Sequence, residues 1–99
     1  MLDKLKQLYD FQKKAKEIQR ELEDHAIETS REAGKVRVVF DGSQKMKGIT
    51  IAEELLKPQK KALLERLIRE CVVEAIGESQ KQAAGKMKEL TGGMGIPGM

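Results

Sequence analysis

The chain is predicted to adopt an α+β fold, in which a three-stranded antiparallel meander lies between an N-terminal and a C-terminal helix. Two observations carry this prediction. The segments at both ends place apolar residues every three or four positions, which is the period of one helix face. Between them the stretch GKVRVVFDGSQKMKGITI, residues 34–51, alternates apolar and polar residues, which is the period of a strand.

The first 25 residues are predicted to form a helix with one narrow apolar stripe. The stripe steps by three and four residues, like the a and d positions of a coiled coil. So thin a stripe needs a partner to be stable, and a second copy of the chain is the expected one. The predicted dimer seam therefore consists of Leu8, Phe11, Ala15, Ile18 and Leu22.

Three cations, Lys6, Lys13 and Arg20, recur every seven residues on the outermost side of this helix, with carboxylates beside them. Two interpretations stay open. The first is a solvated face with pairs such as Lys13 and Glu17, which the balanced charge of the segment favours. The second is a cationic ridge that binds DNA.

Three strands are expected next, over residues 26–33, 35–41 and 45–51. Ala33 and Gly34 can form the first turn, and DGSQ is the expected second turn, with Gly42 able to adopt a positive φ. The core face of the sheet is predicted to hold Val36, Val38, Phe40, Ile49 and Ile51. The other face is predicted to hold Lys35, Arg37, Val39, Met46 and Thr50.

A second helix is expected from Pro58, a residue suited to a first helical turn. Its front half carries two apolar rows at four-residue spacing that should cover the sheet: Leu63, Leu67, Cys71 and Ala75, then Leu64, Ile68, Val72 and Ile76. The rear half is expected to project or to contact a second chain. We predict one domain over residues 1–90 and a flexible Gly/Met-rich tail over residues 91–99.

The composition favours binding over catalysis. Charged residues make up 35% of the chain, with a formal net charge of +3. His25 is the only histidine and Cys71 the only cysteine, so the usual zinc ligands are missing. His25 is expected to be partly buried in the helix seam and Cys71 to be buried in the core. We predict no enzyme, cofactor, metal or small-molecule substrate, and a cytoplasmic protein without a membrane span.

The basic strands suggest a ligand. Lys35, Arg37, Lys45 and Lys47 lie on or beside the predicted sheet, and two copies of the chain would present them twice. No set of aromatic residues is available to stack single-stranded bases. Double-stranded DNA, bound through its phosphates with weak sequence preference, is the predicted partner.

Three segments, in this order, resemble the bacterial YbaB/EbfC family of nucleoid-associated proteins. They are the strand and turn with Gly34, Val36, Val38 and Gly42, the KGITI strand, and the LTGGMGIPGM tail. The resemblance spans nearly the whole chain. It implies a tweezer-like homodimer at the nucleoid that binds double-stranded DNA and influences gene expression. It supplies no DNA-contact motif, so the candidate contacts depend on charge alone.

The chain departs from the family pattern at residues 53–61, EELLKPQKK, where an acidic turn is commoner. Two other readings of the chain stay open. One is a chaperone-like dimer with projecting helices, whose exposed apolar residues would be Met87, Leu90, Met94 and Ile96. The other is an adaptor dimer that binds protein partners and never contacts DNA.

Overall fold

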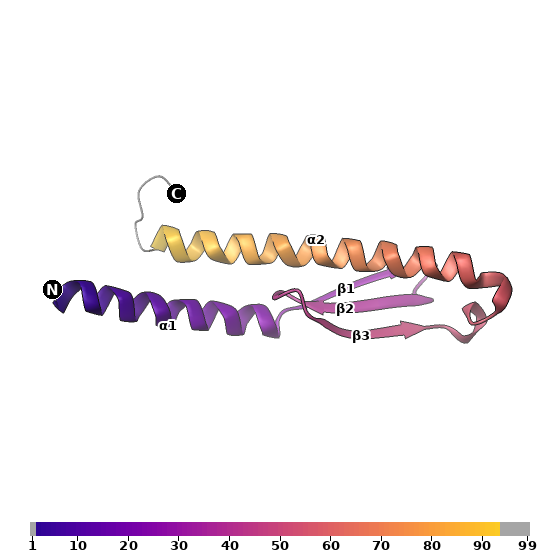
Figure 1. Cartoon of the computed structure of the whole chain (residues 1–99), viewed down its shortest axis with the longest axis horizontal. Coiled ribbons are helices and arrows are strands. Elements are labelled where there is room, and N and C mark those ends of the chain that lie inside the picture. The colour runs from indigo at the N-terminus through magenta and orange to yellow at the C-terminus, as the bar shows by residue number, and fades with distance from the viewer. Residues whose placement is uncertain (1, 94–99) are drawn as a thin grey trace.

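The computed structural model describes residues 2–93 and confirms the predicted order of helix, three strands and helix (Figure 1). Its elements are helix α1 (Leu2–Asp24), strands β1 (Ala26–Arg31), β2 (Val36–Asp41) and β3 (Met46–Ile51), 3₁₀ turns η1 (Glu53–Leu55) and η2 (Pro58–Lys60), and helix α2 (Lys61–Gly93). The molecule is elongated, at 67 × 23 × 17 Å. The front half of α2 covers the sheet and its rear half runs antiparallel to α1. The predicted tail lies mostly outside the described residues.

The sheet is an antiparallel meander in the order β1-β2-β3. The β1–β2 turn places Glu32, Ala33 and Gly34 at positive φ. In the β2–β3 pair the register shifts beside Phe40, so that Met46 lies opposite Phe40. Directly opposed residues share a face. The prediction that Met46 lies on the outer face was therefore wrong, because it assumed an unbroken ladder.

The larger core lies between α2 and the first two strands. The row Leu67, Cys71 and Ala75 on α2 is buried, as its four-residue spacing predicted. It packs with other buried side chains of the sheet and of η1: Ile27, Val36, Val38, Phe40 and Leu55. Helix α2 leaves β3 largely uncovered, so Ile49 is 46% exposed although it pairs with buried Val38.

The smaller core lies between α1 and the rear half of α2. Ile18 and Leu22 are buried against Leu90, and Phe11, Ala15 and Ala83 pack around them. The inner part of the predicted seam therefore meets α2 of the same chain, while Leu8 at its outer end is 54% exposed. Leu90 is buried, which contradicts its suggested exposure in the chaperone-like reading. Met87 is exposed, and Met94 and Ile96 lie outside the described residues.

One prediction about the end of α1 was wrong, and the turn after β2 does not use the glycine that was suited to it. His25 is exposed, because the chain leaves the helix there and enters β1. Gly42 does not adopt a positive φ; Gln44 does, at 69°. Gly42 is required for a different reason, since a Cβ there would lie 2.9 Å from both the Cδ2 and the carbonyl oxygen of Leu22. The turn thus approaches α1 as closely as a glycine permits.

Candidate nucleic-acid interface

Three of the cations predicted on the sheet are paired with carboxylates. The Nζ of Lys35 lies 3.4 Å from Glu54, and the guanidinium of Arg37 lies 3.0 Å from Glu28. The Nζ of Lys47 lies 3.5 Å from Asp41. This arrangement counts against the sheet as the main phosphate-binding platform, because each phosphate would compete with a carboxylate already in place.

Lys45 differs from these three. It is exposed in the turn before β3 and forms no ion pair with any residue in the described range 2–93. It remains a candidate contact.

The cations predicted on α1 are arranged differently. Lys6, Lys13 and Arg20 are exposed, and within residues 2–93 none of them forms an ion pair. In particular, the pairing of Lys13 with Glu17 expected for a solvated face is not formed. These three side chains are therefore available to a phosphate without first leaving a carboxylate.

The structure adds two residues that charge spacing alone had missed. Lys16 and Tyr9 are exposed on the same side of α1 as Lys13, and together with Gln12 they line a shallow groove of about 130 Å³. A step of three, four, three and four residues links the whole set, which we call the outer row: Lys6, Tyr9, Lys13, Lys16 and Arg20. This second stripe has the same period as the apolar one, and the sequence therefore contained a pattern from which Tyr9 and Lys16 could have been identified.

Packing explains why the outer row faces solvent. The apolar stripe on the other side of α1, with Phe11, Ile18 and Leu22, rests on α2. Residues on opposite sides of a helix cannot both face the same neighbour. The outer row therefore lies on the side of α1 turned away from α2, over about 21 Å from Lys6 to Arg20 at 1.5 Å per residue.

Four carboxylates of α1, those of Asp3, Asp10, Glu17 and Glu21, lie on a strip beside the outer row. One of them, Glu21, reaches across to α2 and lies 2.9 Å from the Nζ of Lys86. This hydrogen bond and the nearby negative charges of Glu21 and Glu89 raise the pKa of Lys86. Glu21 thus neutralises a cation of α2 and not a cation of the outer row.

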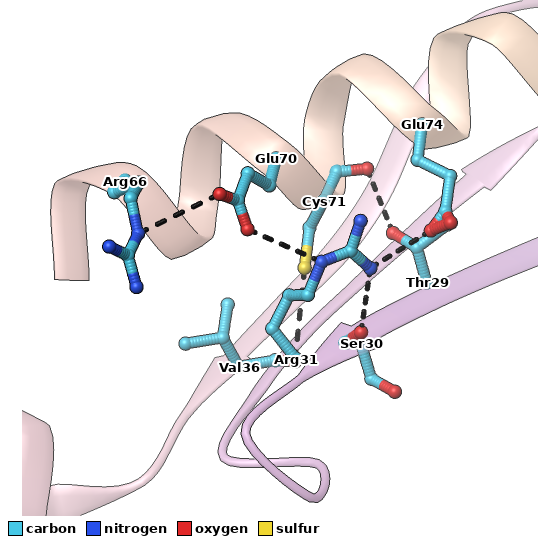
Figure 2. A network of polar contacts seen from close by, with 8 residues as sticks. All are labelled: Thr29, Ser30, Arg31, Val36, Arg66, Glu70, Cys71 and Glu74. Atoms are coloured by element: carbon cyan, nitrogen blue, oxygen red, sulfur yellow. Dashed lines mark hydrogen bonds and ion pairs between the residues drawn. The ribbon is translucent and has the colours of Figure 1, made fainter. Parts of the chain in front are cut away.

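A second polar network joins the end of β1 to α2 (Figure 2). Arg31 lies 3.0 Å from Glu74 and 3.4 Å from Glu70, and Glu70 also contacts Arg66. The hydrogen bond with Glu74 raises the pKa of Arg31. Beside it is a groove of about 350 Å³ that mixes both signs of charge. Arg31 and Arg66 are therefore held by carboxylates, whereas Arg69, which also lines the groove, forms no ion pair within residues 2–93.

Cys71 lies beside this network and is unsuited to chemistry because no solvent reaches its side chain. Its side chain is fully buried, and its main-chain carbonyl accepts a 2.8 Å hydrogen bond from the hydroxyl of Thr29. Across residues 2–93, no three His, Cys, Asp or Glu side chains gather as metal ligands. Neither of the described helices is long and apolar enough to cross a membrane.

Comparison with known proteins supports a nucleic-acid role. Residues 1–94 match the sequence profile of the YbaB/EbfC DNA-binding family. A nucleoid-associated protein of Desulforamulus reducens is 36% identical over 96% of this chain and 90% of its own length. One from Clostridium kluyveri is 34% identical over 96% of this chain and 83% of its own length.

The fold also has a counterpart among solved structures. The crystal structure of an uncharacterised Helicobacter pylori protein, HP0035, aligns with a TM-score of 0.67 at 15% identity. The alignment covers 79% of this chain and 90% of that one, and it supports the fold alone. The family is described by what it binds and not by a reaction, in agreement with the prediction that the chain is not an enzyme. On the profile match and the identity to curated relatives, the chain belongs to the YbaB/EbfC DNA-binding family.

Proposed function

We propose that the protein binds double-stranded DNA as a homodimer, through phosphate contacts made mainly by the outer row of α1. The observation that carries the proposal is that this row is exposed and free of carboxylate partners among residues 2–93, whereas most sheet cations are paired. Family membership supplies the ligand class. As in the relatives named nucleoid-associated proteins, we place this activity at the nucleoid, in the cytoplasm.

The geometry of the row suits a phosphate backbone. About 21 Å of helix runs beside about six phosphates of one DNA strand, which recur every 3.4 Å along the axis. Lysine and arginine heads on flexible stems can each reach one of them, and the Tyr9 hydroxyl can donate a hydrogen bond to another. None of these contacts reads a base, so weak sequence preference follows. Occupying DNA in this way would influence gene expression by limiting access to it.

Uncovered apolar surface supports the homodimer. On β3 and the segment after it, Met46, Ile49 and Leu56 are 47%, 46% and 61% exposed, and Met46 and Ile49 extend the core face beyond the edge of α2. Exposed apolar residues grouped in this way mark interaction surfaces. A second copy related by a twofold axis would cover them and present two outer rows, as in the expected tweezer-like dimer.

The dimer is tested by replacing Ile49 with aspartate. The variant should fold, because Ile49 is not part of the buried core, but it should sediment as a monomer at concentrations where the parent is a dimer. Thr50→Asp, one position along the same strand on the opposite face, is the matched control and should leave the parent's mass unchanged. Equal mass for all three proteins would exclude this face as the interface.

The DNA contact is tested by fluorescence anisotropy of a labelled duplex of arbitrary sequence, titrated at several salt concentrations. Each phosphate neutralised contributes about −0.9 to the slope of log K against log salt, so four row cations predict about −3.6 per chain. Replacing Lys6, Lys13 and Lys16 with glutamine should reduce that slope by about 2.7 per chain.

The matched control removes three other exposed lysines that form no ion pairs among residues 2–93: Lys57, Lys60 and Lys88. It changes the net charge equally and should leave most of the slope in place. An equal loss of slope in both triple variants would contradict the assignment of the row. Absence of binding by the parent even at low salt would favour an adaptor or chaperone-like dimer instead.

A further inference from the structure

We propose that the turn over residues 41–47 is a joint that fixes α1 against the sheet and α2, and that Lys47 serves there as the counter-charge of buried Asp41 instead of contacting DNA. Asp41, Gly42 and Lys47 would thus be positioning residues for the outer row. The part of this inference that concerns DNA rests on the proposed function. The part that concerns the stability of the fold can be measured without DNA.

One oxygen of Asp41 organises the turn. Asp41 is the last residue of β2 and is only 1% exposed. Its Oδ1 accepts hydrogen bonds from the main-chain N–H of Ser43 at 2.8 Å, the hydroxyl of Ser43 at 2.7 Å and the main-chain N–H of Lys45 at 3.1 Å. Its own main-chain N–H donates to the carbonyl of Lys45. The carboxylate therefore closes the turn from inside.

The other oxygen has only a cation beside it. Oδ2 of Asp41 is buried and has no hydrogen-bond partner within residues 2–93, but the Nζ of Lys47 lies 3.5 Å away. A buried charge without a partner is costly, so a cation at this position is needed to balance it. Lys47 is 53% exposed, which leaves its ammonium partly hydrated while it faces the carboxylate.

The shifted register makes this contact possible. Val39 pairs with Gly48 and Phe40 pairs with Met46, so Lys47 has no partner on β2. Without the shift, Lys47 would lie opposite Phe40, on the face that packs beneath α2. An irregularity of this kind redirects a side chain. Here the redirected side chain is the one that meets Asp41.

The charge state of Asp41 agrees with this role. Burial by itself would raise the pKa of the carboxyl group. The hydrogen bonds from Ser43 and from the main chain of Lys45, together with the nearby Lys47 ammonium, outweigh the burial and lower the pKa to about 2. Asp41 is therefore ionised at neutral pH and requires the counter-charge throughout.

The same turn connects three elements. The carbonyl of Asp41 accepts a 2.9 Å hydrogen bond from the hydroxyl of Ser79, which is fully buried on α2. The main-chain N–H of Gly42 donates to the carbonyl of Leu22 in the last turn of α1, at 2.7 Å. Leu22 belongs to the smaller core and Phe40, beside Asp41, to the larger one. The turn thus sets the direction in which α1 leaves the sheet, and with it the placement of the outer row.

A double-mutant cycle on the full-length protein tests the pair. Lys47→Met, Asp41→Asn and the double variant are compared with the parent by urea unfolding and by the salt slope of duplex binding. If Lys47 acts through Asp41, Lys47→Met should shift the unfolding equilibrium about tenfold toward the unfolded state, and this effect should largely vanish with Asn at position 41. The salt slope should stay at the parent value in Lys47→Met.

Two results would overturn the assignment: an equal stability effect of Lys47→Met in both backgrounds, or a fall of the salt slope by about 0.9 per chain, the signature of a lost phosphate contact. Lys47→Arg keeps a cation near Asp41 and should retain the parent's stability. If Asp41→Asn does not fold, the comparison of Lys47→Met with Lys47→Arg takes the place of the cycle, because only the second variant keeps a positive charge beside Asp41. If neither the parent nor any variant binds DNA, the proposed function is wrong. The unfolding data still test whether Lys47 stabilises the protein through Asp41.

The joint itself is tested by a distance. Nitroxide labels on Lys14→Cys of α1 and Lys88→Cys of α2, in a Cys71→Ala chain, report the separation of the two helices. Gly42→Ala should lengthen and broaden this distribution, because the added methyl group collides with Leu22. Ser79→Ala, which removes only the bond to the Asp41 carbonyl, should broaden it less. Distributions identical to the parent's in both folded variants would overturn the role of the turn as a joint.

Discussion

The cations of α1 and the cations of the sheet carry the same charge but differ in what lies beside them. On α1, four of the acidic residues occupy their own strip of the helix, and one of these, Glu21, pairs with Lys86 of α2. On the sheet, Glu28 is a diagonal cross-strand neighbour of Arg37 on the same face. The chain then folds back so that Ala52 hydrogen-bonds to Lys35, which places Glu54 of η1 beside it. Availability to a ligand is therefore decided by neighbours that only the fold supplies.

This difference depends on the smaller core, which turns the outer row of α1 toward solvent. Leu90 is 3% exposed and packs against Ile18 and Leu22. We expect Leu90→Ala to lower the free energy of unfolding by about 2–4 kcal/mol, because it leaves a cavity between the two helices. Urea unfolding measures this loss. Met87→Ala, at a position 52% exposed on the same helix, should cost far less, and equal losses would show that α1 does not depend on this core.

Acid should weaken the junction between the two regions. The folded state lowers the pKa of Asp41 to about 2 from an ordinary 3.8, so its ionised form contributes stability that is fully present above about pH 4. That contribution, about 2 kcal/mol, should be lost as the pH falls from about 4 to 2. Urea unfolding across this range measures it. Asp41→Asn should lack this component of the pH dependence, and an identical pH profile for the two proteins would contradict the assignment.

Tyr9 offers a test within the outer row that does not involve charge. Its side chain is 66% exposed and lines the groove with Lys13 and Lys16. If its hydroxyl donates to a phosphate, Tyr9→Phe should weaken duplex binding about threefold to tenfold, the range for a hydrogen bond to a charged group near solvent. The salt slope should not change, because tyrosine carries no positive charge. A changed slope, or unchanged affinity, would remove Tyr9 from the contact.

Periodicity was enough to predict the elements but not their partners. Steps of three and four gave α1 and the covering rows of α2, and alternation gave β2 and β3. The stripe of α1 predicted that Ile18 and Leu22 need a partner, but it could not distinguish a second copy from the rear of α2. That choice depends on a single unbroken helix of 33 residues reaching back beside α1.

The remaining differences have local causes. One shifted residue pair moved Met46 to the core face and freed Lys47 to meet Asp41. Gly42 was expected to supply a turn conformation, but its function is to allow contact with Leu22, a residue 20 positions earlier that no local pattern connects to it. Such contacts depend on strand register and on tertiary packing, which no local sequence pattern reports. For the same reason, the ion pairs of the sheet cations could not be predicted from the number or spacing of the charges.

The smallest expected effect tests the sheet side of the comparison. Lys35 and Arg37 form half-exposed ion pairs, which contribute about 0–1 kcal/mol each to stability. Replacing both with glutamine should weaken duplex binding less than about threefold and leave the salt slope nearly unchanged, because their charge is already balanced by Glu54 and Glu28. A slope reduced by about 1.8 per chain would mean that the phosphates displace those carboxylates. In that case the sheet and α1 would form one continuous DNA-binding surface. The ion pairs of the free protein would then weaken phosphate binding only on the sheet and not on α1.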